Sequence, residues 1–78
     1  MTIWFTRIYD RHARVYVDHA FDAETAKHGG TLSEPLASGA AFCGEVFSNK
    51  LVTSQTRPSL PVCERCVSHI GTIFRGRG

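Results

Sequence analysis

The sequence predicts a small α+β domain in which three to four antiparallel strands precede one C-terminal helix. The first observation is the abundance of β-branched and aromatic residues, partly in strict alternation, in the first part of the chain. The second is a change to a period of nearly four residues from Val62 onward, which is typical of an amphipathic helix. Because 78 residues suit one core, residues 1–78 are expected to fold as a single domain.

Two strands are expected at the N-terminal end. Residues 2–9 are rich in β-branched and aromatic side chains, and residues 10–13 suit a tight turn. Residues 14–21 then alternate, so that His19 shares one face with Phe21 and other apolar residues. The ring of His19 is therefore expected to point toward the interior.

The middle of the chain is expected to hold a loop followed by two more strands. Residues 22–39 are rich in Ala, Thr, Ser and Gly, and we interpret them as an inserted surface loop, with one helical turn at 22–26. Residues 40–47 favour a third strand, and residues 51–55 favour a fourth after a turn at residues 48–50.

The expected helix begins after Pro61 and ends in a short basic tail. Its apolar stripe consists of Cys63, Cys66, Val67, Ile70 and Phe74. The basic residues of this end are Arg57, Arg65, Arg75 and Arg77, with Glu64 as the acidic counterpart.

The cysteines form the most informative pattern in the chain. Cys63 and Cys66 stand at the expected start of the helix, where the helix dipole favours thiolates, and Cys43 is followed by Gly44. Two cysteines at this spacing can bind one metal ion, which one more Cys and one His would complete as a tetrahedral zinc site. A core of this size contributes only about 3–5 kcal/mol, so a structural metal would add decisive stability.

The fourth ligand is predicted among the four histidines. His19 is favoured because it lies in phase with the buried face of its strand. His28 is the main alternative, since its glycine-flanked segment could fold over the metal. The remaining alternatives are His69, one turn after Cys66, and His12 or an acidic residue.

Other interpretations of the cysteines are a set of small buried side chains and a Cys-x-x-Cys redox pair. Redox chemistry of that kind normally follows a strand in a βαβ unit, which the predicted pattern does not offer. A closed site of three Cys and one His leaves no coordination position for water, and the sequence has no catalytic triad or phosphate-binding glycine loop. We therefore expect no enzyme activity and no small-molecule substrate.

A resemblance supports the same metal site. His19, the segment Ala41-Phe-Cys43-Gly44 and the segment Pro61-Val-Cys63-Glu-Arg-Cys66-Val67 resemble the small one-His, three-Cys zinc-finger proteins of high-GC Gram-positive bacteria and their phages. The resemblance covers about His19 to Ile70 and implies a zinc-stabilised β-meander with a C-terminal helix, similar to a treble clef. Members of that group are mostly of unknown function, so it implies a fold and a metal, and no activity.

The remaining expectations concern location and partners. An odd number of cysteines, together with an N-terminus that lacks the pattern of a signal peptide, favours a reducing cytoplasm, and no apolar run is long enough for a membrane span. The net charge of +2 is mild. We expect a protein-interaction regulator that docks through a strand edge or residues 22–39. The alternative is a nucleic-acid-binding zinc finger that uses Lys50, Arg57, Arg65, Arg75 and Arg77, with an exposed Trp4, Phe5, Tyr9 or Tyr16 for stacking.

Overall fold

The computed structural model describes residues 1–75, and it confirms the α+β class with more strands than expected. In chain order, the elements are β1 (Ile3–Asp10), β2 (Val15–Asp22), β3 (Lys27–Gly30), β4 (Pro35–Ala40), β5 (Val46–Thr53) and α1 (Glu64–Arg75). The prediction of three to four strands was therefore too low by at least one. No helix among the described residues is long and apolar enough to cross a membrane.

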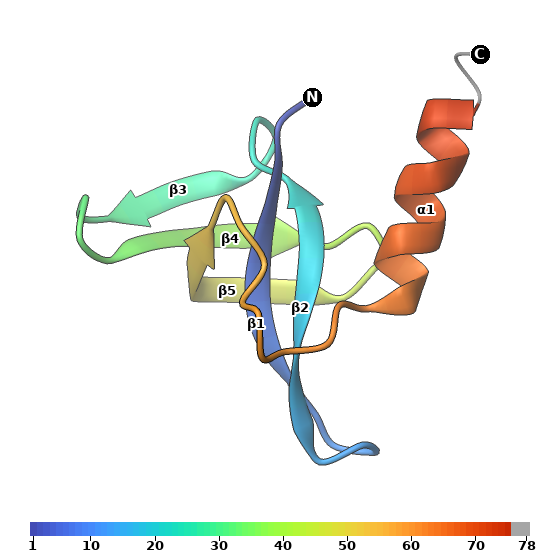
Figure 1. Cartoon of the computed structure of the whole chain (residues 1–78). Helices are drawn as coiled ribbons and strands as arrows, with labels where there is room; N and C mark the ends of the chain where they lie inside the picture. The colour runs from blue at the N-terminus through green and yellow to red at the C-terminus, as the bar shows by residue number, and fades with distance from the viewer. Residues whose placement is uncertain (76–78) are drawn as a thin grey trace.

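The strands form one antiparallel sheet in the order β2-β1-β5-β4-β3. Figure 1 shows that β1 and β2 cross the direction of β3, β4 and the first part of β5. Strand β5 belongs to both parts because it bends: Asn49 has a φ of 48°, and the pairing with β4 shifts register between Ala37 and Gly39. After the bend, Val52 and Thr53 pair with β1.

The first hairpin agrees with the sequence prediction to within about one residue at each end. Strands β1 and β2 pair along their whole length, from Ile3 opposite Asp22 to Asp10 opposite Val15. The Asp10 carboxylate accepts hydrogen bonds from the backbone N–H groups of His12 (2.9 Å) and Ala13 (3.2 Å), and Arg14 takes a left-handed φ of 57°. Asp10 therefore fixes the tight turn through its own side chain.

The prediction of a surface loop at residues 22–39 is wrong, because these residues contain β3 and β4. Residues 23–26 form a simple turn in place of the expected helical turn. Gly30 has a φ of 75°, and a Cβ added there would lie 2.2 Å from the carbonyl oxygen of Glu34, so glycine is required at the start of this hairpin loop. Residues of low strand propensity are extended here because β4 pairs with β5, which is a tertiary effect.

The strand expected at residues 40–47 and the turn expected at residues 48–50 are also wrong. Strand β4 ends at Ala40, residues 41–45 form a turn that carries Cys43, and β5 runs through residues 48–50 without a break. The turn-like composition of Ser48-Asn49-Lys50 corresponds to the left-handed bend inside β5, which Asn tolerates well.

The interior consists of two apolar clusters on opposite sides of β2. One cluster contains Phe21, Ala37, Phe47 and Val52, with Trp4 and Ile8 packed against it. The other contains Ala20, Ala41 and Cys66, with Phe5, Phe42 and Ile70 at its margin. The end of β2 is consequently buried on both faces, because α1 stands beside it on the second side (Figure 1).

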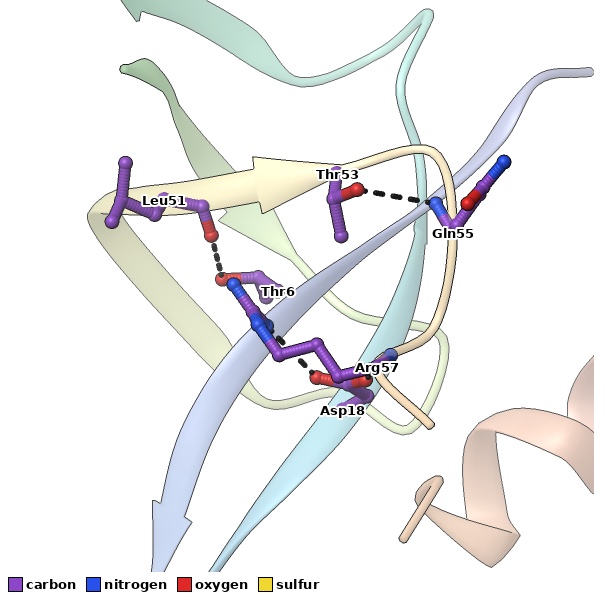
Figure 2. A network of polar contacts seen from close by, with 6 residues as sticks. All are labelled: Thr6, Asp18, Leu51, Thr53, Gln55 and Arg57. Atoms are coloured by element: carbon purple, nitrogen blue, oxygen red, sulfur yellow. Dashed lines mark hydrogen bonds and ion pairs between the residues drawn. The ribbon is translucent and has the colours of Figure 1, made fainter. Parts of the chain in front are cut away.

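A buried ion pair holds the connection between β5 and α1 against β2. The side chain of Asp18 is fully buried and accepts hydrogen bonds from the backbone N–H of Arg57 (2.9 Å) and from its guanidinium (3.2 Å). Figure 2 shows this pair near Thr6, whose hydroxyl donates to the carbonyl of Leu51 (3.1 Å). These contacts direct residues 57–63 along the outer edge of β2.

Candidate metal centre

Four side chains from three separate segments meet at the outer edge of β2. His19 comes from β2, Cys43 from the turn between β4 and β5, and Cys63 and Cys66 from the start of α1. Their ligand atoms all lie within 4.8 Å of one another, so this group could hold a metal ion. The structure therefore brings together the same four residues that the sequence nominated.

The distances within the cluster fit a tetrahedral ion. His19 Nδ1 lies 3.3 Å from Cys43 Sγ and 3.8 Å from Cys66 Sγ. Zinc bond lengths of about 2.0–2.1 Å to nitrogen and about 2.3 Å to sulfur give N···S edges of roughly 3.6 Å in a tetrahedron. The two measured N···S distances are close to this value, so His19, Cys43 and Cys66 can share one small thiophilic ion.

The backbone edge of β2 positions Cys63. Asp18 forms a parallel bridge with Val62, in which its N–H donates to the carbonyl of Pro61 and its carbonyl accepts from the N–H of Cys63, both at 2.9 Å. This pairing places Cys63 beside His19, the next residue on β2. The outer edge of β2 can position the site because its backbone N–H and C=O groups are not paired within the sheet.

The same edge positions Cys43 one step further along. The carbonyl of Ala20 accepts a hydrogen bond from the N–H of Phe42 (2.9 Å), and the N–H of Gly44 donates to the carbonyl of Ala41 (2.9 Å) to close the turn. Gly44 has a φ of 95° and an open environment around the place of a Cβ. Glycine is therefore favoured at this position by the left-handed backbone conformation and not by a lack of space.

The first turn of α1 supplies the last two thiols. The carbonyl of Cys63 accepts the first helical hydrogen bond, from the N–H of Val67 (3.1 Å), so Cys63 occupies the N-cap position and Cys66 lies one turn along. The positive end of the helix dipole favours negative charge at this position. Of the predicted apolar stripe, Cys66 is buried and Ile70 half-buried, whereas Val67 is 53% exposed; the side chain of Phe74 lies outside the described part of the chain.

The electrostatics of Cys66 show why a cation would be stabilising. Burial raises the pKa of the Cys66 thiol to about 12, while hydrogen bonds from the backbone N–H groups of Cys43 and Ala20 act in the opposite direction. A Cys66 thiolate would accept these backbone hydrogen bonds, but it lacks a compensating positive charge beside it. A bound cation supplies that charge, and binding then releases the proton of Cys66.

Burial also keeps His19 available as a neutral ligand. Desolvation lowers the pKa of His19 below its usual value, with Glu45, Asp10 and Asp18 opposing this effect through their charges. The imidazole is therefore unprotonated near neutral pH, which is the form that binds metal ions. Nδ1 is the atom that faces the thiols of Cys43 and Cys66.

The other histidines have different surroundings. His28, the alternative ligand, contacts the carbonyl of Ala23 through Nε2 and packs edge-on against Trp4, with 5.6 Å between ring centroids. His69 stacks on Phe42 at 5.6 Å, and His12 lies in the exposed turn after β1. None of these three joins the cysteine cluster.

The basic residues proposed for nucleic acid come from separate segments of the described chain. Arg57 is engaged with Asp18, at 3.2 Å. Lys50 is exposed on β5 and Arg65 is exposed on α1. The side chain of Arg75 and all of Arg77 lie outside the described residues.

Asp18 is the important residue that the sequence pattern missed. The alternation of residues 14–21 places Asp18 on the face of Tyr16 and Ala20, opposite His19, and does not indicate that Asp18 is buried there. A usable signal was present, because Ala20 is apolar and a single arginine, Arg57, precedes Pro58 in the connection to the helix.

Comparisons of this chain with protein-family models, curated proteins and solved structures found no match. The resemblance to one-His, three-Cys zinc-finger proteins is consequently supported by the sequence pattern alone, that is, by His19, Cys43, Cys63 and Cys66.

Proposed function

We propose that this chain is a structural-zinc binding module and that His19, Cys43, Cys63 and Cys66 bind the zinc ion. The observation that carries the proposal is the convergence of three thiols and one imidazole nitrogen within 4.8 Å. Three sulfur ligands and one nitrogen ligand in a tetrahedral arrangement are typical of zinc, which prefers thiolate and imidazole together.

The proposed role of the metal is structural. Four protein ligands complete the coordination shell, so water has no position from which zinc could activate it. The site ties β2, the turn at residues 41–45 and the start of α1 to one point, and the apolar cluster beside it is small. This arrangement supports a binding module over an enzyme.

The direct test is the metal content of the purified, reduced protein. We expect one equivalent of zinc per chain by elemental analysis, because a folded site of this kind retains its ion. Replacement of zinc by Co²⁺ should give the visible spectrum of a tetrahedral thiolate complex. A folded, monomeric sample that contains no metal would refute the proposal.

The function that we propose for the module is that of a protein-interaction regulator, of phage or bacterial origin as the resemblance implies. The supporting surface is the β3–β4 hairpin, which falls within the predicted docking segment at residues 22–39. Strand β3 is the last strand of the described sheet, so its outer backbone edge is free to pair. Beside it, Trp4 and Leu36 line an open groove of about 600 Å³, and Leu32 is fully exposed at its rim.

A matched pair of substitutions tests this docking surface. Leu32→Glu should abolish capture of a protein partner from a lysate of the native host, whether or not nuclease is added. Val46→Glu is the control, because Val46 is also an exposed apolar residue (77%) and lies on β5, away from the groove. Equal capture by both variants would contradict docking at the β3–β4 hairpin, and loss of capture after nuclease treatment would favour a nucleic-acid bridge.

A further inference from the structure

The β1–β2 hairpin extends away from the rest of the molecule. Strand β1 is paired with β5 only at Phe5 and Thr6, whereas its pairing with β2 continues to Asp10. Figure 1 shows the hairpin reaching beyond the other strands and the helix. Its distal part, residues 7–17, is therefore a two-stranded ribbon with largely exposed side chains.

Two tyrosines on this ribbon are paired with each other and remain open to solvent. Tyr9 and Tyr16 lie directly opposite in the register and meet edge to face, with 5.1 Å between ring centroids. They are 47% and 49% exposed, so they are not core residues. Trp4 and Phe5, the other aromatic candidates for stacking, pack against the two apolar clusters.

The ribbon that carries the tyrosine pair also carries cationic side chains. The guanidinium of Arg7 lies over the ring of Tyr16, 5.1 Å from its centroid, and Arg11 and Arg14 are exposed in the turn. The only carboxylate of this ribbon, that of half-buried Asp10, is already hydrogen-bonded to the backbone of the turn. The ribbon thus has an excess of positive charge beside two available aromatic rings.

We infer that the distal part of the β1–β2 hairpin binds single-stranded nucleic acid. Unstacked bases can stack on the exposed tyrosines, while arginines contact the phosphates, and this combination is typical of single-strand binding surfaces. An arginine stacked on a ring keeps its outer N–H donors free for phosphate oxygens. The inferred surface shares no residue with the zinc site, with the β3–β4 hairpin or with Lys50, Arg57 and Arg65.

The test uses the full zinc-loaded chain and a fluorescently labelled mixed-sequence DNA oligonucleotide of about 15 nucleotides. Fluorescence anisotropy should show binding that weakens steeply with salt, since each phosphate contact on a single strand contributes about 0.7 to the logarithmic salt slope. A duplex of the same sequence should bind more weakly, because its bases are not free to stack on tyrosine.

Substitutions then locate the surface. Arg11→Gln combined with Arg14→Asn should flatten the salt slope by about 1.4, which corresponds to two lost phosphate contacts. Arg14→Asn is chosen because Asn tolerates the left-handed φ of 57°. Tyr16→Leu should weaken binding roughly 5- to 150-fold, the equivalent of one lost stacking contact, and Tyr16→Phe should restore it. Lys27→Gln, an exposed cation on β3, is the control and should leave affinity unchanged.

Three results would overturn the inference. The first is unchanged affinity in the arginine and tyrosine variants while their zinc content and circular dichroism stay normal. The second is a loss of binding in Lys50→Gln or Arg65→Gln, which would place the nucleic acid on the C-terminal half of the chain. The third is tighter binding of a polyglutamate peptide than of the oligonucleotide, which would indicate an acidic protein as the partner of the hairpin.

Discussion

Cys66→Ser is expected to abolish both zinc binding and the fold. Cys66 is fully buried, and its sulfur accepts hydrogen bonds from the backbone of Cys43 and Ala20 at the centre of the cluster. A structural zinc contributes roughly 10–16 kcal/mol of apparent binding free energy, whereas a core of this size provides only about 3–5 kcal/mol. Circular dichroism and zinc content of the purified variant should therefore both fall to the level of the chelator-treated wild type.

The other ligands provide the comparison series. Cys43→Ser, Cys63→Ser and His19→Ala should each cause a large loss of zinc retention. His12→Ala should be nearly silent, because His12 lies in an exposed turn. Release of zinc by His28→Ala together with retention by His19→Ala would show that the fourth ligand is wrongly assigned.

Acid should reproduce the effect of the chelator. The Cys66 thiol, with a pKa of about 12, is protonated near neutral pH, so zinc must displace its proton. Below that pKa, the affinity for zinc is expected to decrease about tenfold per pH unit from Cys66 alone. The free energy of unfolding of the zinc-bound protein is consequently greatest at alkaline pH, and it decreases as the pH falls.

The candidate site could be predicted because its ligand types are recognisable in the sequence, although the fold assembles them from three separate segments. Cys63 and Cys66 are spaced to share an ion, and the alternation of residues 14–21 aims His19 inward. The strands β1 and β2 have high intrinsic strand propensity, so their positions were predicted to within about one residue.

The parts that were missed depend on contacts between distant segments. Strands β3 and β4 have the composition of a loop and are extended because β4 pairs with β5. The burial of Asp18 was missed because the outer face of β2 becomes interior only when residues 57–63 and α1 cover it. The extension of β3 and β4 has no local signature in the sequence, and the burial of Asp18 is signalled there only by apolar Ala20 and by Arg57.

Removal of the Arg57 side chain is expected to cause the second large loss of stability. Arg57→Met would leave the fully buried carboxylate of Asp18 without its cationic partner, and breaking a buried ion pair typically costs about 3–5 kcal/mol. We expect a value near the lower limit, about 3 kcal/mol, because the side chain of Arg57 is 30% exposed. Urea unfolding of the zinc-loaded protein measures this difference.

A double-mutant cycle separates the ion pair from simple packing. Asp18→Ala combined with Arg57→Met should be less destabilising than the sum of the two single changes, since the double variant contains no unpaired buried charge. Additive losses would mean that the pair contributes no coupling energy. Because Asp18 also holds Cys63 beside His19 through its backbone, a displaced 57–63 segment should in addition speed the transfer of zinc to a chelator in Arg57→Met. His12→Ala, on the exposed turn of the same hairpin, should leave that transfer rate unchanged.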